Sequence, residues 1–554
     1  MSRTLPVWKR IPHGGRIWLL AFAAFGLLAV AWSLAMPADG TTDERQHVER
    51  AYGAVTGRLL AAQSIDPLVH RPGGTFEVPK SLLPPNALCV YFPNYRQDRS
   101  WVARSASCQH PAPATHAKVR VVSWVGRYNP LYYLAVGLPL RFWPDMTGIV
   151  LSRVLAALLS AGFAATAAAI AIRSRRPLLL AALLTVLTPT TIALSSTVNP
   201  NGIEITAAAL LWVCLVDLAR PSSAGFPAAS RSVSARSAAF GRISARWALG
   251  RPPLARPELL GLAAVSGAVV LTVRAMGPFW FALAVVGAAA VAEPGRIRAL
   301  LKWRAVRLVG AVWTVIGLLA VAWNVVSGNN KVTHTLIAEH PADHRVSTLL
   351  RLIAVDRVGG WFAEAFALDV PAPWAPMLWA ALSAAVLIPL ALLRTRRVLL
   401  AALAVATISL GVTLVLEIKF LGTLGWSQYG RYFLPGLAGT AVLLAAGPAD
   451  ELPPALRRRL PRLFALGAAG CHLWVLTVEM TRVQAGPAAP LDPLAGSWHP
   501  AVGSPAVLVI AALGAAALIT LAWAATEPVT DTRRPVPAPY HTAESRVAAG
   551  ALNP

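Results

Sequence analysis

The chain has 554 residues, of which 56% are hydrophobic and only 14% are charged, and its mean hydropathy is +0.56. This composition excludes a soluble protein of this length and indicates a multi-pass membrane protein. The net charge of +25 raises the question of nucleic-acid binding. No basic motif with interleaved aromatic residues supports that function, so we expect no nucleic-acid partner.

Apolar runs of about 17–25 residues, the length of a membrane span, recur along the whole chain. We therefore predict an all-α polytopic membrane protein with about 12 transmembrane helices, in a range of about 11–13. The expected spans are residues 16–36, 147–172, 177–195, 203–219, 258–273, 278–292, 308–327, 375–393, 398–416, 432–447, 462–480 and 504–524. The first run is long and lacks a small-residue cleavage site, so we interpret it as an uncleaved anchor.

Lysine and arginine gather in alternate loops, as expected for loops that stay in the cytoplasm. This pattern predicts cytoplasmic termini, and it explains the excess charge by topology and by contact with anionic lipid. The predicted organisation is a cytoplasmic N-terminus 1–15, a first transmembrane helix 16–36, a large extracytoplasmic loop 37–146, helices 2–7 within 147–327 with a basic, disordered cytoplasmic loop 219–257, a second extracytoplasmic loop 328–374, helices 8–12 within 375–524 and a disordered cytoplasmic tail 525–554.

The first extracytoplasmic loop opens with the sequence TTDERQH at Thr41–His47. Thr41 and Glu44 have the spacing of a capping box, so a helix is expected to start here with Asp43 and His47 on one face. Acids in the first turn are favoured by the helix dipole, which is the structural interpretation. The functional interpretation is a general base at the outer membrane surface, where an enzyme with a lipid-carried substrate needs one.

The same loop contains a short apolar segment, Pro130–Trp143, which is too short to span a membrane and is expected to form an interfacial or re-entrant helix. Its tyrosines, including Tyr132, suit a membrane interface. Cys89 and Cys108 lie 19 positions apart in this loop and form either a disulfide, which suits an oxidising exterior, or two unpaired thiols.

Arg153 falls inside the second expected span, where a charge is costly and requires a partner, a function or an escape to the membrane surface. The short loop SSTVNPNG at Ser195–Gly202 contains Asn199 and is typical of a tight turn. Glu204, which starts the following span, is a candidate partner for a cation at the outer end of the helices.

Arg431 lies at the outer start of another span, in the sequence QYGRYFLP that runs from Gln428 to Pro435. Its planar fork suits a phosphate or diphosphate, and the alternative is an ordinary interface belt of aromatic and arginine residues. In the second loop, His334, His340 and His344 have no zinc-site spacing, so metal binding is not expected there.

Together the motifs TTDERQH, NPLYY, VNPNG and QYGRYFLP, with the arginine of the second span, resemble a bacterial family of predicted membrane proteins, the domain of unknown function 2142. The resemblance covers roughly residues 15–450, and VNPNG and GRYFLP are its most specific parts. The family is grouped with membrane glycosyltransferases of the GT-C fold, so it implies a GT-C-like enzyme in the plasma membrane of a bacterium.

The resemblance also implies roles for individual residues. Asp43 would be the general base that deprotonates an acceptor hydroxyl, with Glu44 as second candidate and His47 as a hydrogen-bonding neighbour. Arg431 would offset charge on the departing lipid phosphate. The remaining residues expected to line the substrate and phosphate site are Gln428, Tyr429, Asn199, Tyr132 and Arg153.

The expected donor is a polyprenyl-phosphate-linked sugar, and the expected acceptor is a glycan or another component of the cell envelope. A divalent cation such as Mg²⁺ or Mn²⁺ is used by some GT-C enzymes, although this sequence has no second acidic cluster that demands one. Two other functions stay open: a transporter or flippase for a lipid-linked glycan, and a non-catalytic membrane scaffold. A transporter should place ionisable residues near the middle of its spans, whereas here they lie near the span ends.

Overall fold

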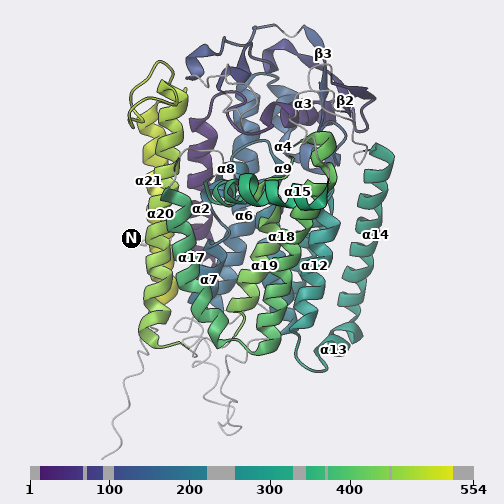
Figure 1. Cartoon of the computed structure of the whole chain (residues 1–554), viewed down its shortest axis with the longest axis vertical. Coiled ribbons are helices and arrows are strands. Elements are labelled where there is room, and N and C mark those ends of the chain that lie inside the picture. Colours follow the sequence, from purple (N-terminus) through teal and green to yellow (C-terminus); the bar gives the residue numbers. More distant parts are fainter. Residues whose placement is uncertain are drawn as a thin grey trace, which may run out of the picture.

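The structure, a computed structural model, describes residues 13–66, 72–90, 105–115, 117–220, 256–328, 345–367, 372, 374–425, 427–447 and 452–527. Long helices form a bundle, and a small β-sheet and several short helices gather at one end of it, which we call the sheet end (Figure 1). Most of the N-terminus 1–15, most of the expected basic loop 219–257 and nearly all of the tail 525–554 lie outside the described residues. The predicted disorder of the loop and of the tail therefore stays a prediction.

The helices and strands follow one another along the chain in a regular order. They are α2 (His13–Ala35), α3 (Glu44–Val55), β1 (Gln63–Ile65), β2 (Pro72–Pro79), β3 (Lys118–Ser123), α4 (Pro130–Val136), α5 (Leu138–Phe142), α6 (Met146–Arg173), α7 (Pro177–Leu184), α8 (Pro189–Ser195), α9 (Pro200–Ala219), α11 (Arg256–Val273), α12 (Gly277–Ala290), α13 (Arg296–Lys302), α14 (Arg304–Ser327), α15 (Val346–Leu352), α16 (Val358–Ala367), α17 (Trp374–Leu393), α18 (Arg396–Leu424), α19 (Leu434–Ala445), α20 (Pro454–Ala485) and α21 (Ser504–Thr526). Single turns also occur, of which η4 (Ile353–Arg357) and η5 (Gly430–Phe433) matter below.

Among the described residues, nine helices are long and apolar enough to cross a membrane, or ten if α7 and α8 count as one broken span. The expectation of twelve spans is therefore wrong. The run 177–195 is split into α7 and α8, which meet at an angle of 73°. The runs 278–292 and 432–447 form only the 14-residue α12 and the 12-residue α19. Helices of these lengths rise about 18–21 Å, which is short of the roughly 30 Å hydrocarbon layer.

The expectation of an all-α chain is also wrong, because β1, β2 and β3 form an antiparallel sheet in the order β1-β2-β3. The long pairing joins β2 to β3 from Gly74↔Ser123 to Pro79↔Lys118. Helix α3 packs against this sheet where its Gly53 meets Phe76 of β2. A Cβ atom at Gly53 would lie 2.3 Å from that ring, so only glycine allows the approach. The sheet therefore fixes the position of the helix that follows Asp43.

The short apolar segment 130–143 forms α4 and α5, separated at Gly137. Leu131, Leu138 and Phe142 are exposed on these two helices, which agrees with the interfacial helices expected for this loop. In the second long loop, α15, η4 and α16 run across the bundle rather than along it (Figure 1).

The centre of the bundle is α9, almost all of whose residues are buried. It packs against α6, α11, α12 and α19, while α2 lies between α6 and α21. Because α9 starts at the sheet end with Asn199 as its N-cap, its first turn lies beneath the loop that carries Asp43. The cluster of polar residues described next is built where these elements meet.

Candidate functional site

Glu44 is a structural anchor at the start of α3. Its carboxylate accepts both arms of the Arg153 fork, with Nε to Oε1 at 2.6 Å, and both side chains are fully buried. The same guanidinium donates to the carbonyl oxygens of Ser33, Met36 and Pro37 at the end of α2. Arg153 therefore does not reach outward to the membrane surface. It ties α2 and α3 to α6, and it leaves Glu44 no free oxygen for chemistry.

The capping box expected at Thr41–Glu44 does not form. Helix α3 starts at Glu44, and the Thr41 hydroxyl is buried without a hydrogen-bond partner in the described part of the chain. The physical reason is that Arg153 occupies the Glu44 carboxylate, which can then not fold back onto the backbone. Asp43 instead precedes the helix in the left-handed conformation, with φ 62° and ψ 8°. Few non-glycine residues adopt this conformation, and aspartate is one of the more tolerant.

Arg431 is a buried cation of the site. It lies in η5, and its Nη1 pairs with one carboxylate oxygen of Glu364 on α16, whose other oxygen accepts the Gly430 N–H at 2.8 Å. The rings of Tyr429 and Tyr432 lie 4.1 and 5.1 Å from its Cζ. Its Nε and Nη2 are buried and donate no hydrogen bond to any described residue. Such unsatisfied donors are costly, and an anion would satisfy them.

Asp43 and Arg431, 388 positions apart in sequence, meet at the sheet end. Asp43 Oδ2 lies 3.8 Å from Arg431 Nη2, and the Asp43 side chain remains 30% exposed while that of Arg431 is wholly buried. The distance is an ion-pair contact rather than a hydrogen bond. The site thus combines an accessible carboxylate with a sequestered cation whose fork is only partly used.

A second cation, Arg274, follows α11. Its side chain is 16% exposed, and its Cζ lies 4.5 Å from the Tyr432 ring. It pairs with Glu204 at 3.5 Å and donates to the Asn201 side chain. Glu204 therefore has the cationic partner that its position suggested. The guanidinium groups of Arg274 and Arg431 therefore both contact the Tyr432 ring.

Asn199 links the start of α9 to the Asp43 loop. Its side-chain oxygen caps the helix by accepting the Asn201 N–H at 3.0 Å, and its amide donates to the Thr42 carbonyl oxygen at 3.3 Å. The residue is buried. Its observed contacts are with protein groups, so it positions the residue before Asp43.

His47 lies one turn into α3 and turns away from Asp43 towards α4. Its Nδ1 is 2.7 Å from the Tyr133 hydroxyl, and the two rings stack at 5.9 Å. Burial, followed by the charges of Arg274 and Arg431, lowers the pKa of His47 to about 3. The imidazole is therefore neutral at ordinary pH and supplies no proton. Tyr132 is buried against Tyr133, with ring centroids 5.1 Å apart.

Gln428 bonds mainly through its backbone, and its side-chain amide donates to the Ser427 hydroxyl at 3.2 Å. Its N–H donates to Glu417 at 2.6 Å, and its carbonyl oxygen accepts from Arg357 and Trp361 at 2.9 Å. These contacts hold the segment before η5 against α18 and α16. Burial raises the pKa of the Tyr429 phenol above its ordinary value, so that ring stays neutral beside Arg431.

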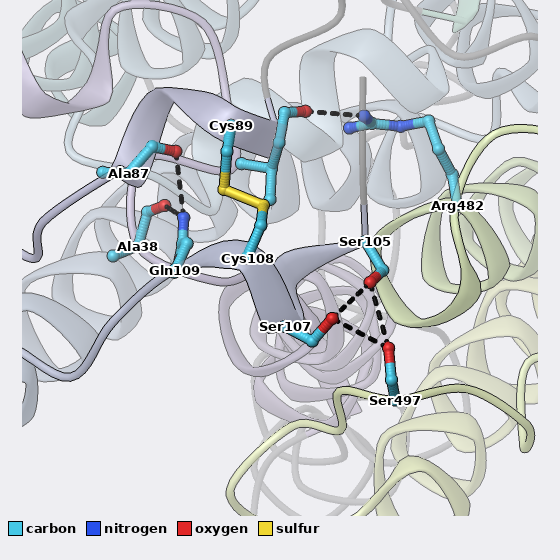
Figure 2. The surroundings of a disulfide bond; sticks show 10 residues. Ala38, Ala87, Cys89, Ser105, Ser107, Cys108, Gln109, Arg482 and Ser497 are labelled. Carbon is cyan, nitrogen blue, oxygen red and sulfur yellow. Dashed lines mark hydrogen bonds between the residues drawn. A yellow bond between two sulfur atoms is a disulfide. The ribbon is translucent and has the colours of Figure 1, made fainter. Parts of the chain in front are cut away.

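Cys89 and Cys108 form a disulfide, which Figure 2 shows at the junction of three segments. Beside it, the Gln109 side chain donates to the carbonyl oxygens of Ala38 and Ala87 at 2.6 and 3.0 Å. On the other side, Ser105 and Ser107 bond to Ser497 in the loop between α20 and α21. The disulfide-bearing segment therefore connects the chain just after α2 with the other end of the sequence.

Sequence reasoning missed Glu364, the closest partner of Arg431. A signal existed, because Trp361, Glu364 and Ala365 have the i, i+3, i+4 spacing of one helix face and are all buried. An acid on such an apolar face calls for a buried cation. No group of three or more His, Cys, Asp and Glu side chains able to hold a metal occurs among the described residues. The histidine cluster at 334–344 lies outside them.

Comparison with known proteins gives one match. The model of a family described as a predicted membrane protein, DUF2142, matches residues 25–245. No curated protein matches the chain, and no solved structure does. The matched segment includes Asp43 and Arg153 and ends before Glu364 and Arg431. The comparison and the fold agree on a multi-pass membrane protein, and neither assigns an activity.

Proposed function

We propose that the protein is a membrane glycosyltransferase of the GT-C type that takes a sugar from a polyprenyl-phosphate donor and transfers it to a cell-envelope acceptor. In this proposal the sheet end faces the outside of a bacterial plasma membrane, as the distribution of basic loops suggests. The proposal rests on one observation: the partly exposed Asp43 carboxylate faces a buried Arg431 whose Nε and Nη2 donate no hydrogen bond within the described structure.

In the proposed reaction, Asp43 accepts the proton of the acceptor and Arg431 stabilises the negative charge of the leaving phosphate. Asp43 takes the proton from the acceptor hydroxyl while that oxygen attacks the anomeric carbon. The bond from the anomeric carbon to the lipid phosphate oxygen breaks, and its electron pair leaves with the polyprenyl phosphate. Attack from the opposite face inverts the anomeric configuration. Arg431 donates its unused N–H groups to the phosphate, whose charge grows as the bond breaks.

The surrounding contacts support this division of roles. Glu44 is occupied by Arg153. His47 is bonded to Tyr133, and its lowered pKa makes the imidazole a weak proton acceptor, so neither residue competes with Asp43 as the base. Glu364 fixes the orientation of Arg431 without consuming its whole fork. We assign no step to a divalent cation.

The main alternative, a transporter or flippase of lipid-linked glycans, has one observation in its favour. The span formed by α7 and α8 is broken by 73°, and broken spans are common in transporters. Here, however, the break is filled by protein: Trp379 donates to the Thr185 carbonyl oxygen at 3.0 Å, and Thr188 donates to that of Ala365 at 2.9 Å. The break therefore places α8 against α16, which carries Glu364.

The test is release of sugar from a panel of polyprenyl-phosphate sugars by the purified chain in lipid nanodiscs, with and without cell-envelope acceptors. Asp43→Asn is expected to reduce transfer at least about 100-fold, the range of general-base catalysis, without changing the folded yield. Asp492→Asn is the matched control, because Asp492 is an exposed acid of the loop before α21 that bonds only the Leu494 N–H among described groups. Full transfer by the Asp43 variant would eliminate the proposed base, and lipid scrambling without transfer would favour the transporter.

A further inference from the structure

A second cationic site lies at the end of the bundle opposite the sheet end. A cavity of about 300 Å³ there is lined by Arg256 and Pro257 of α11, by Arg296, Ala299 and Leu300 of α13, and by Trp303. Helix α13 is seen at this far end in Figure 1. The volume falls at the lower limit of ordinary ligand pockets, and the site shares no residue with the Asp43–Arg431 cluster.

The two arginines of this cavity are poorly compensated. Arg296 uses its Nε to bond the Leu218 carbonyl oxygen at 2.8 Å, while its Nη2 is buried and has no hydrogen-bond partner among the described residues. Burial, and next the charge of Arg256, lower the pKa of Arg296, and Glu293 opposes this in part. Two guanidinium groups thus face one cavity, and no acid is among the described residues that line it, so the cavity has donors and positive charge to offer an anion.

The other walls and the location indicate which anion fits. Leu300, Ala299 and Pro257 give the cavity an apolar side, and Trp303 is an indole at the start of α14. Helices α11 and α14, which both begin here, are candidate membrane spans. A cationic pocket with an aromatic residue at the end of two spans matches the boundary between lipid tails and headgroups, where phosphates lie.

We propose that this cavity binds the phosphate group of an anionic phospholipid, with Arg256 and Arg296 as its two ligands and the Leu300 side in contact with the first acyl carbons. The same two arginines would also accept a free phosphate ester, which lacks those carbons. The proposal is independent of any glycosyltransferase activity, because it concerns the opposite end of the molecule.

The test measures lipid binding to the delipidated full chain in detergent by native mass spectrometry. Phosphatidylglycerol is expected to bind at least about tenfold more tightly than phosphatidylcholine. Arg256→Gln with Arg296→Gln should weaken phosphatidylglycerol binding about thirty-fold, from two ionic contacts. The matched control is Arg298→Gln with Lys302→Gln, which removes the same charge from exposed positions of α13 outside the cavity and should change binding less than about threefold.

Arg296 also supports α9, so the double variant can lose stability. Arg256→Gln alone removes an exposed side chain and should weaken binding about fivefold with an unchanged unfolding temperature. Competition with glycerol 1-phosphate then distinguishes a phospholipid from a free phosphate ester as the ligand. Displacement of the bound lipid supports a site for phosphate alone. Persistence of the bound lipid supports recognition of the headgroup together with its acyl chains. Equal binding of the two lipids, or equal effects of the cavity and control variants, would overturn the proposal.

Discussion

The neighbouring acids Asp43 and Glu44 should differ several-fold in how much stability the fold loses when one of their charges is removed. Glu44→Gln removes the carboxylate from a fully buried pair with Arg153 and leaves an amide N–H₂ facing an arginine N–H. Removing one partner of a buried ion pair costs about 3–5 kcal/mol, because the remaining charge stays buried without compensation. Glu44→Gln is therefore expected to destabilise the fold by that amount.

Asp43→Asn should cost less than about 1 kcal/mol, the upper range for a partly exposed ion pair. Arg431 keeps its contact with Glu364, and asparagine adopts the left-handed backbone of Asp43 as readily as aspartate does. The two substitutions thus lie at adjacent positions, yet the expected losses of folding stability differ several-fold. An activity loss in Asp43→Asn would then reflect chemistry and not unfolding.

The assay is thermal unfolding in detergent, followed by the fraction that elutes as a monodisperse peak. With an unfolding entropy of about 2.1 cal/mol/K per residue, a chain of 554 residues shifts by about 1 °C per kcal/mol. We expect midpoints lowered by about 3–5 °C for Glu44→Gln and by less than about 1 °C for Asp43→Asn. The double variant Glu44→Gln with Arg153→Gln should lose less than the sum of the single variants. A Glu44 variant as stable as the wild type would refute the anchor role.

Three further predictions concern elements around the site. Gly430→Ala should reduce the folded yield at least about tenfold, because its Cβ would lie 1.9 Å from the Trp361 carbonyl oxygen, a backbone atom that cannot move aside cheaply; recovery after size exclusion measures this. Cys89→Ser with Cys108→Ser should lower stability by about 3 kcal/mol from loop entropy, and reductant should then have no further effect on the unfolding midpoint. Burial raises the pKa of Asp39 to about 7, so this acid holds a proton longer in the folded state and its contribution to stability declines as pH rises from about 4 to about 7; Asp39→Asn should remove that decline in unfolding scans across the range.

The sequence predicted the membrane class and most long helices, because a run of apolar residues reports burial in lipid directly. The sequence overestimated the number of spans, because an apolar run does not show whether it forms one long helix or a shorter buried one. Helix α19 is as apolar as its neighbours, yet it is only 12 residues long and buried along nearly all of its length. The sheet was missed for a different reason. Strand β2 contains Pro72, Gly73 and Gly74, residues that normally argue against a strand.

The site was predicted in part. The family resemblance implied that Asp43 and Arg431 act at one site, and the structure brings them to 3.8 Å. The sequence alone could not show that two adjacent acids have different roles. Asp43 and Glu44 carry the same charge, and only the position of Arg153 distinguishes them, since it depends on how α6 packs against α2. The place of Glu364 on an apolar helix face gave a signal for a buried acid, but not the identity of its partner, which lies 67 positions further along the chain.

Asp43 is held in its unusual backbone conformation from both sides, and this bears on its role. The carbonyl oxygen of the preceding Thr42 accepts the Asn199 amide, and the side chain of the following Glu44 is fixed by Arg153. A left-handed non-glycine residue costs of order 1–3 kcal/mol and persists only where its neighbours impose it. A helix cap would need no such restraint, because an extended N-cap residue forms without strain. The two clamps orient the Asp43 carboxylate towards Arg431 before any substrate binds, and that preorganisation is what the proposed base requires.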